Sequence, residues 1–160
     1  MPDQRPLLLL DVDGVLNPFA ADGCPPGYQE FPFFPDEDPV WLCPGHADWL
    51  RELAGHFEIV WVTAWGHEAN THIAPVLGLP RLPVIEFPPI PFHPREKVPA
   101  VASFVGDHPA AWIDDSLTQE AREWAASRTS PTLLLDIDAA IGLTRAAVDT
   151  SLRWAQAHRR

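Results

Sequence analysis

The sequence predicts an α/β fold, a three-layer sandwich in which a five-stranded, mainly parallel sheet carries helices on both faces. Two observations predict it. Short apolar runs alternate about five times with segments of helical periodicity, which is typical of a parallel sheet covered by helices. The runs are also apolar without polar alternation, as expected for strands that are buried on both faces.

Five segments predict the strands of this sheet. The first contains four consecutive leucines bracketed by Pro6 and Asp11, and its continuous apolar character indicates a fully buried strand. The third is short and is flanked by prolines. In chain order the predicted strands cover residues 6–11, 57–62, 83–87, 110–113 and 132–135.

Five helices are predicted between and after these strands. The second is stopped by Gly78 and Pro80, and the third tolerates Pro99 only because this residue lies in its first turn. The fourth is identified by the spacing of its apolar residues. In chain order the predicted helices cover residues 45–55, 67–77, 97–105, 117–125 and 144–158.

Length and composition predict one soluble domain. The chain has 160 residues, of which 46% are hydrophobic and 21% charged. These values exclude intrinsic disorder and suit one domain over residues 1–160, with an insertion rich in proline, glycine and phenylalanine at about 17–42. No apolar run reaches the length of a membrane helix, and the leucine run is too short for a signal peptide. We therefore expect a cytoplasmic protein without a membrane partner.

The net charge is −11, and Lys97 is the single lysine. Such a charge repels nucleic-acid backbones and anionic membranes at long range, so a phosphate must be held by a local device such as a metal ion or converging donors. The two cysteines, Cys24 and Cys43, do not form a disulfide scaffold and are expected to be reduced thiols. A zinc site that combines them with His46 is an alternative, but a convincing fourth ligand is missing.

Acidic residues directly follow the first predicted strand. Asp11 and Asp13 are two residues apart, so on an extended segment their side chains point the same way. Gly14 then allows a sharp turn. Taken alone, Asp13 before a glycine is equally typical of an ordinary turn.

Further polar residues follow the other strands, where ligands bind in parallel sheets. Thr63 ends the second strand, Asp114 and Asp115 end the fourth, and Lys97 lies between the third and fourth strands. Gathered carboxylates repel one another unless a cation lies among them, and oxygen ligands suit Mg²⁺. The chemistry that fits is phosphoryl transfer, in which one carboxylate attacks phosphorus and another protonates the leaving oxygen.

The order of these residues resembles the four motifs of the haloacid dehalogenase (HAD) superfamily. The first motif is Asp-Val-Asp-Gly-Val-Leu-Asn at 11–17, followed by Thr63, Lys97 and the acidic pair at 114–115. The wider sequence is similar to the HAD domain of Swiss Army Knife RNA repair proteins, notably at residues 10–18, 61–65, 77–80 and 111–115. The resemblance implies a Rossmann-like, HAD-type sheet and hydrolysis of a phosphomonoester.

The resemblance also implies roles for the matched residues. Asp11 would be the nucleophile that forms a phospho-aspartate, and Asp13 the general acid and base. Thr63 and Lys97 would bind the phosphate. Two acids in the first motif match the phosphatases of the superfamily, because its dehalogenases lack the second.

Ligands for Mg²⁺ follow from the same resemblance. They would be the Asp11 carboxylate, the Asp13 backbone carbonyl and Asp114, with Asp115 binding directly or through water. Neither family insertion point is long enough for a separate cap domain, and the insertion at 17–42 suffices only for a flap. An open site suits a phosphorylated small molecule, a nucleotide or a nucleic acid end; the family favours the last, whereas the charge disfavours long polymers.

Two other functional classes are considered. A phospho-aspartate switch like a bacterial receiver domain also uses Asp, Thr, Lys and Mg²⁺, but its phosphorylated Asp ends the third strand, where this chain has no Asp. A non-catalytic binding module on the same scaffold is the second. A second Asp-x-Asp pair, Asp136 and Asp138, lacks a following glycine and is expected to serve turns and caps.

Several aromatic and histidine residues are also considered for the site. Trp65 follows the phosphate-binding strand and is as consistent with lining the site as with packing, whereas His67 is less favoured as a substrate contact. The aromatic residues of the insertion are expected to pack it onto the body in preference to stacking a nucleobase; they are Phe19, Tyr28, Phe31, Phe33 and Phe34.

Overall fold

The computed structural model describes residues 5–158 and confirms an α/β fold with a parallel central sheet. Its four strands lie in the order β4-β1-β5-β6, and every neighbouring pair is parallel. The strands are β1 (Leu7–Leu10), β4 (Glu58–Trp61), β5 (Ala110–Asp114) and β6 (Thr132–Asp136). Because β1 lies between β4 and β5, the segment that follows β1 is flanked by the carboxyl ends of both neighbouring strands.

The predicted fifth strand at 83–87 is not confirmed. Here the chain makes a single parallel bridge between Val84 and Trp61 at the edge of the sheet. The Trp61 N–H donates to the carbonyl of Pro83 at 2.9 Å, and the Ile85 N–H donates to the Trp61 carbonyl at 3.0 Å. Prolines before and after this segment have no N–H to donate, so the ladder does not continue.

Alternate leucines of β1 serve two separate cores. Leu8 and Leu10 belong to one apolar cluster and Leu7 and Leu9 to the other, because successive side chains of a strand point to opposite faces. All four are buried. The uninterrupted apolar run is therefore the direct consequence of helices on both sides of the sheet.

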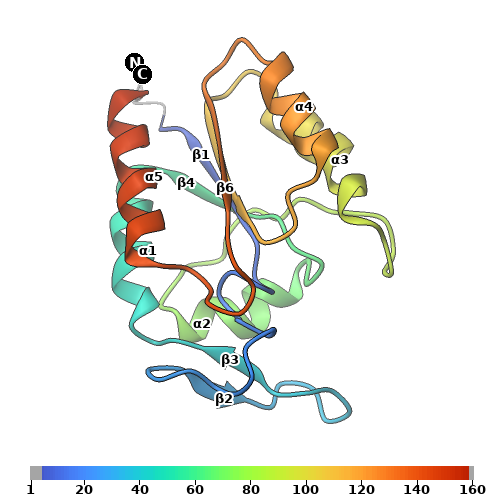
Figure 1. The fold of residues 1–160 in the computed structure, drawn as a ribbon, viewed down its shortest axis with the longest axis vertical. Helices are drawn as coiled ribbons and strands as arrows, with labels where there is room; N and C mark the ends of the chain where they lie inside the picture. The colour runs from blue at the N-terminus through green and yellow to red at the C-terminus, as the bar shows by residue number, and fades with distance from the viewer. Residues whose placement is uncertain (1–4, 159–160) are drawn as a thin grey trace.

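Helices cover both faces (Figure 1). The pair α1 (His46–Ala54) and α5 (Arg145–Ala157) packs on one face, and α3 (Lys97–Val105) and α4 (Gln119–Ser127) on the other. These four confirm the predicted helices apart from small differences at their ends. A short 3₁₀ turn, η2 (Pro94–Glu96), precedes α3.

The helix predicted at 67–77 differs in kind. It consists of a π-helical turn, η1 (Ala69–Ile73), followed by the short α2 (Ala74–Val76). Pro75 has no N–H to donate to the preceding turn, which prevents a regular α-helical ladder there. Within residues 5–158, no helix is long and apolar enough to cross a membrane.

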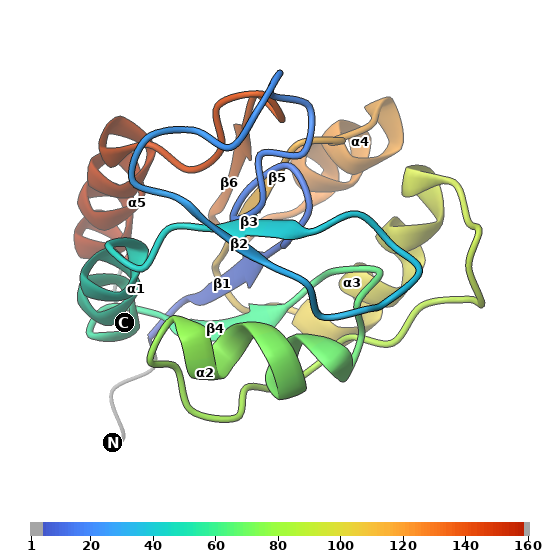
Figure 2. The ribbon, with the colours of Figure 1, turned by 90° about the horizontal axis from the view of Figure 1, so that it is seen from below.

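Residues 17–42 contain a small antiparallel ladder, β2 (Gln29–Phe31) and β3 (Val40–Leu42). Figure 2 shows it in front of the carboxyl ends of the central strands. The Trp41 N–H donates to the Asn17 side chain at 3.0 Å, and the rings of Phe33 and Phe34 lie 6.2 and 5.6 Å from that of Trp65. Phe33 and Phe34 thus pack the insertion onto the body as expected, whereas Phe19 is 55% exposed and differs from that expectation.

Candidate active site

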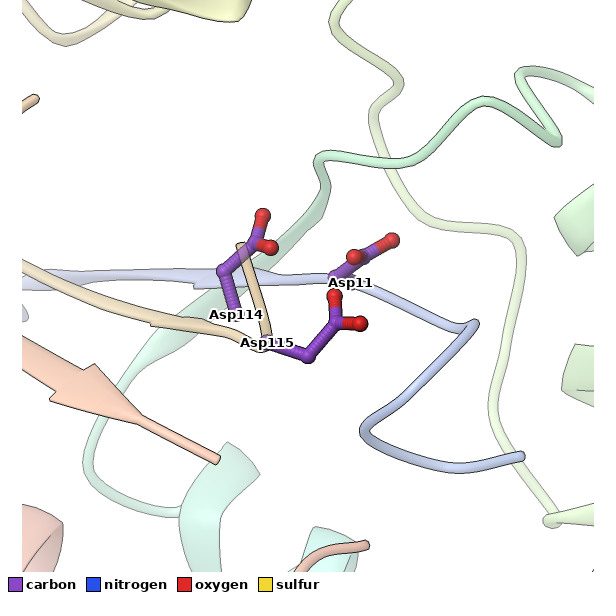
Figure 3. Close-up of side chains that lie close together, drawn as sticks. All are labelled: Asp11, Asp114 and Asp115. Carbon is purple, nitrogen blue, oxygen red and sulfur yellow. The ribbon is translucent and has the colours of Figure 1, made fainter. Parts of the chain in front are cut away.

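Three carboxylates converge where the central strands end (Figure 3). Asp11 directly follows β1, Asp114 is the last residue of β5, and Asp115 follows it. One oxygen from each lies within 4.8 Å of the others, and this is the only such group of three or more potential metal ligands among residues 5–158. Clustered carboxylate oxygens are the ligands that Mg²⁺ prefers.

Burial and mutual repulsion disfavour the ionised form of this cluster. The pKa of Asp11 lies well above its usual range because burial removes the carboxylate from water and Asp114 lies beside it; Lys97 opposes this shift only in part. Burial and Asp114 also raise the pKa of Asp115. A divalent cation among these oxygens offsets both effects, so the residues present fit Mg²⁺.

Gly14 permits the close approach of Asp115. Its φ of +83° lies in the left-handed region. A Cβ at this position would lie 2.2 Å from the Asp115 Cγ. The glycine after the acidic pair is therefore required by the approach of the β5 loop as well as by the turn that the sequence predicts.

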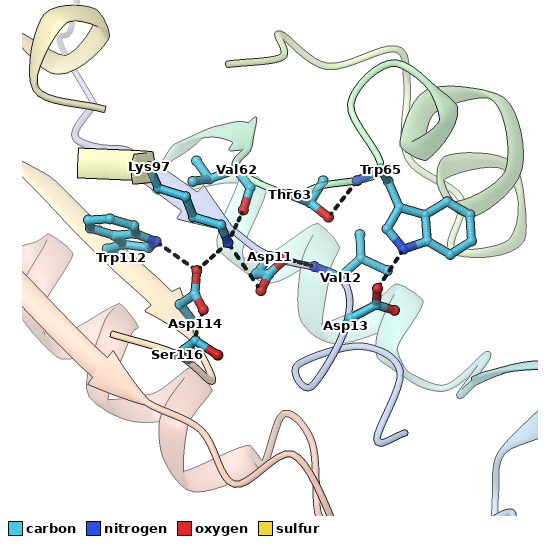
Figure 4. Close-up of polar contacts among 10 residues, drawn as sticks. All are labelled: Asp11, Val12, Asp13, Val62, Thr63, Trp65, Lys97, Trp112, Asp114 and Ser116. Atoms are coloured by element: carbon cyan, nitrogen blue, oxygen red, sulfur yellow. Dashed lines mark hydrogen bonds and ion pairs between the residues drawn. The ribbon is translucent and has the colours of Figure 1, made fainter. Parts of the chain in front are cut away.

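Lys97 is buried and lies between two of the carboxylates (Figure 4). Its Nζ donates to Asp114 Oδ2 at 2.8 Å and to the Val62 carbonyl at 3.3 Å, and it lies 3.4 Å from Asp11 Oδ2. Burial lowers the pKa of Lys97, but the two carboxylates raise it by more, so the net shift is upward. The ammonium group thus stays charged and fixed beside Asp11.

Asp114 is held by donors that the sequence analysis did not identify. The Trp112 indole N–H donates to its Oδ2 at 3.2 Å, and the Ser116 backbone N–H donates to its Oδ1 at 2.9 Å. Trp112 is otherwise a buried residue of the core. A buried indole usually finds a hydrogen-bond partner. The only signal in the sequence is that Trp112 lies two residues before Asp114, and this spacing does not identify the partner.

Asp13 lies at the mouth of the site and is also held by two donors. The Trp65 indole N–H donates to its Oδ2 at 3.1 Å, and the Asn17 amide donates to its Oδ1 at 3.0 Å. Trp65 therefore lies at the site, one of the two options that its position left open. Asn17 closes the first motif, but its contact depends on a turn that spacing alone does not predict.

Thr63 is buried behind the mouth of the site. Its Oγ1 accepts a hydrogen bond from the Trp65 backbone N–H at 3.2 Å. A hollow of about 280 Å³ is lined by Asp11, Asp13, Lys97 and Asp115, whereas Thr63 lines an adjoining hollow. The structure thus gathers the sequence-predicted residues at one edge, although Thr63 and Asp114 do not line the hollow beside Asp11.

The other candidates lie outside this site. Asp136 pairs with Arg122, its carboxylate oxygens lying 2.7 and 2.9 Å from the guanidinium Nη2, and Asp138 accepts the Ala140 N–H within a turn, as expected. His67 contacts Glu86 at 2.8 Å. The zinc alternative gains no support, because within 5–158 only the aspartate cluster brings three potential ligands together.

A parallel sheet carries clustered aspartates and a buried lysine at its carboxyl edge, which defines an α/β protein with an acidic site where ligands bind in such sheets. A family model described as the HAD domain in Swiss Army Knife RNA repair proteins matches residues 7–148. The chain belongs to this family, and the resemblance noted in the sequence is confirmed. No curated protein and no solved structure matches the chain. Family membership supports a hydrolase at the level of the superfamily.

Proposed function

We propose that the protein is a Mg²⁺-dependent phosphomonoester hydrolase that works through a phospho-aspartate on Asp11. The observation that carries this proposal is the convergence of Asp11 with Asp114, Asp115 and Lys97 beside a hollow that Asp13 also lines. Clustered carboxylates fit a cation, and the lysine fits the negative charge of a phosphate.

In the first step, a carboxylate oxygen of Asp11 attacks the phosphorus of the substrate. The Asp11 Oδ1 accepts the Val12 N–H at 2.8 Å, which fixes the orientation of the carboxylate. As the bond from phosphorus to the leaving oxygen breaks, Asp13 gives its proton to that oxygen and an alcohol departs. Lys97 stabilises the charge on the transferring group.

In the second step, water attacks the phosphorus of the phospho-aspartate. Asp13, now ionised, takes a proton from this water, and the bond between phosphorus and the Asp11 oxygen breaks. Inorganic phosphate leaves, and both aspartates return to their starting forms. Asp13 is suited to both steps because it lies at the mouth of the hollow, within reach of alcohol and water alike.

The residues that would hold Mg²⁺ are Asp11 and Asp114 with the backbone carbonyl of Asp13, joined by Asp115 directly or through water. When bound, the ion neutralises charge on the carboxylates and the phosphate. We further propose that residues 1–160 form one HAD-like domain in which the insertion at 17–42 serves as a flap. The family description supports a nucleotide or an RNA end as the substrate class.

The test is release of phosphate from p-nitrophenyl phosphate, with and without Mg²⁺, by wild type and Asp11→Asn. We expect turnover that requires Mg²⁺ and is absent from the variant, with unchanged circular dichroism as the control for folding. Equal rates in both proteins would contradict the role of Asp11. Binding of Mg²⁺ and phosphate without turnover of any phosphomonoester would instead indicate a non-catalytic module, and a phospho-aspartate that persists would indicate a switch.

A further inference from the structure

Two further hollows adjoin the catalytic hollow, the 280 Å³ space beside Asp11. The first, here the aromatic pocket, has a volume of about 410 Å³ and is lined by Phe19, Phe34 and Trp65. The second, the proline hollow, has about 320 Å³ and is lined by Thr63 and the proline-rich loop at 88–92. Ala64 and Ile90 line all three spaces, so the three hollows are direct neighbours.

The position of Asp13 selects one of these spaces for the leaving group. Asp13 lines the catalytic hollow and the aromatic pocket but not the proline hollow. Under the proposed function, on which this argument rests, the leaving oxygen lies within hydrogen-bond reach of Asp13. The rest of the leaving group therefore extends past Asp13 into the aromatic pocket.

The walls of the aromatic pocket suit a flat ring. Phe19 and Ile90 flank its entrance and are 55% and 70% exposed, although both side chains are large and apolar. Behind them the rings of Phe34 and Trp65 pack at a centroid distance of 5.6 Å. The volume lies in the range of small-molecule sites, and exposed apolar groups beside a site are typical of surfaces that a ligand covers.

The charges around these spaces oppose a second phosphate. Glu37, Asp38 and Glu68 line the aromatic pocket. Lys97 is the only Lys, Arg or His among the residues that line the three spaces, and it already contacts two carboxylates. A second phosphate on the leaving group would thus face carboxylates without a cationic partner.

We propose that the aromatic pocket binds the leaving group of a monophosphate, and that this group is an uncharged, ring-bearing alcohol of nucleoside size. The same pocket discriminates against a leaving group with a further phosphate. Among the substrates compatible with the proposed function, a free mononucleotide is therefore preferred to a polynucleotide end.

The charge argument is tested with three substrates at fixed free Mg²⁺ and low ionic strength. They are adenosine monophosphate (the faster of the 5′ and 3′ isomers), adenosine 3′,5′-bisphosphate and glycerol 2-phosphate. We expect kcat/KM for the bisphosphate to be about tenfold or more below that for the monophosphate. The double variant Glu37→Gln with Asp38→Asn should reduce the ratio of kcat/KM for the monophosphate to kcat/KM for the bisphosphate about fivefold. The control is Asp36→Asn, which should leave this ratio unchanged, because Asp36 is an exposed neighbour outside all three spaces.

The stacking argument is tested with Phe19→Ala. Loss of a stacking ring should lower kcat/KM for adenosine monophosphate about fivefold or more relative to glycerol 2-phosphate, which has no ring. Phe104→Ala is the matched control, because Phe104 is also exposed but lines a pocket away from the site. In this variant the ratio of kcat/KM for adenosine monophosphate to kcat/KM for glycerol 2-phosphate should equal that of wild type.

The outcomes separate this proposal from the proposed function. Turnover that depends on Asp11, but is equal for the monophosphate and the bisphosphate and unaffected by Phe19→Ala, would overturn the leaving-group proposal and leave the phosphatase intact. Faster turnover of phosphorylated oligonucleotide ends than of the mononucleotide would overturn it as well. Absence of turnover for every substrate would overturn both.

Discussion

Two Asp-x-Asp pairs follow parallel strands of one sheet, yet they have different surroundings. Asp11 follows the central strand β1 and is buried among other carboxylates, whereas Asp136 ends the edge strand β6 and forms an exposed ion pair with Arg122. The local spacing is the same. What differs is the neighbourhood: β1 has a strand on each side that delivers further polar residues, and β6 has a neighbour on one side only.

The loops after these pairs are nevertheless connected. The Leu143 N–H donates to the Val15 carbonyl at 2.7 Å, and the Ala20 N–H donates to the Ala139 carbonyl at 3.2 Å. The loop after β6 thus supports the turn that carries the catalytic candidates. Under the proposed function, one Asp-x-Asp pair serves chemistry, whereas the other belongs to the scaffold beneath it.

The largest expected difference in activity is between Asp11→Asn and Asp136→Asn. Loss of the nucleophile should lower kcat about thousandfold or more, and loss of the exposed ion pair should leave kcat unchanged. In the absence of Mg²⁺, Asp11→Asn should also unfold at a higher urea concentration than wild type, because a buried carboxylate with a raised pKa destabilises the fold when ionised. Asp136→Asn should cost less than about 1 kcal/mol. Equal activity of the two variants would remove the distinction.

Substitutions of Asp13 and Asp138, the second members of the two pairs, should differ in their effect on activity, because only Asp13 is proposed to act as a general acid. Asp13→Asn should lower kcat about 10²- to 10⁴-fold, because the leaving alcohol departs without a proton donor. Asp138→Asn should keep wild-type activity, since Asp138 caps a turn with the Ala140 N–H. Activated substrates need no proton donor, so p-nitrophenyl phosphate should be less affected by Asp13→Asn than an alkyl phosphate. A similar loss for both substrates would contradict this role.

Much of this distinction follows from the sequence, because apolar runs predict which strands are buried and motif order predicts which polar residues share an edge. The contacts that arise only from packing could not be predicted. The indole N–H groups of Trp112 and Trp65 reach Asp114 and Asp13 because of side-chain orientation. The fifth strand is not confirmed for a different reason: apolar content favours a strand at 83–87, but the prolines around it, which are visible in the sequence, remove the donors that a ladder needs.

His46 makes the stability of the fold depend on pH. It lies beside Leu143, which joins the loop after β6 to the turn after β1. Burial lowers its pKa from 6.5 to about 4, against a smaller upward effect of its hydrogen bond with the Leu143 backbone. The unfolded chain therefore binds a proton between about pH 6.5 and 4 that the folded chain does not, so stability falls as pH falls through this window, by up to about 3 kcal/mol.

Urea unfolding of wild type and His46→Leu at several pH values measures this effect. The leucine cannot be protonated, so the difference in unfolding free energy between the two proteins should change across that window. Parallel curves for wild type and His46→Leu would show that His46 does not titrate on unfolding.

The two Asp-x-Asp pairs differ in the residue that follows them, which is Gly14 after Asp13 and Ala139 after Asp138. Gly14→Ala combines a left-handed backbone with a clash against Asp115, whereas Gly78→Ala has the left-handed backbone alone, since nothing lies within 4 Å of its Cβ position. Both variants should lose about 1–2 kcal/mol of stability from the backbone. Only Gly14→Ala should weaken Mg²⁺ binding, by about tenfold, because the displaced Asp115 no longer supports the site. Calorimetric titration with Mg²⁺ tests this difference, and equal affinities would mean that the glycine serves the turn and not the approach of the acid.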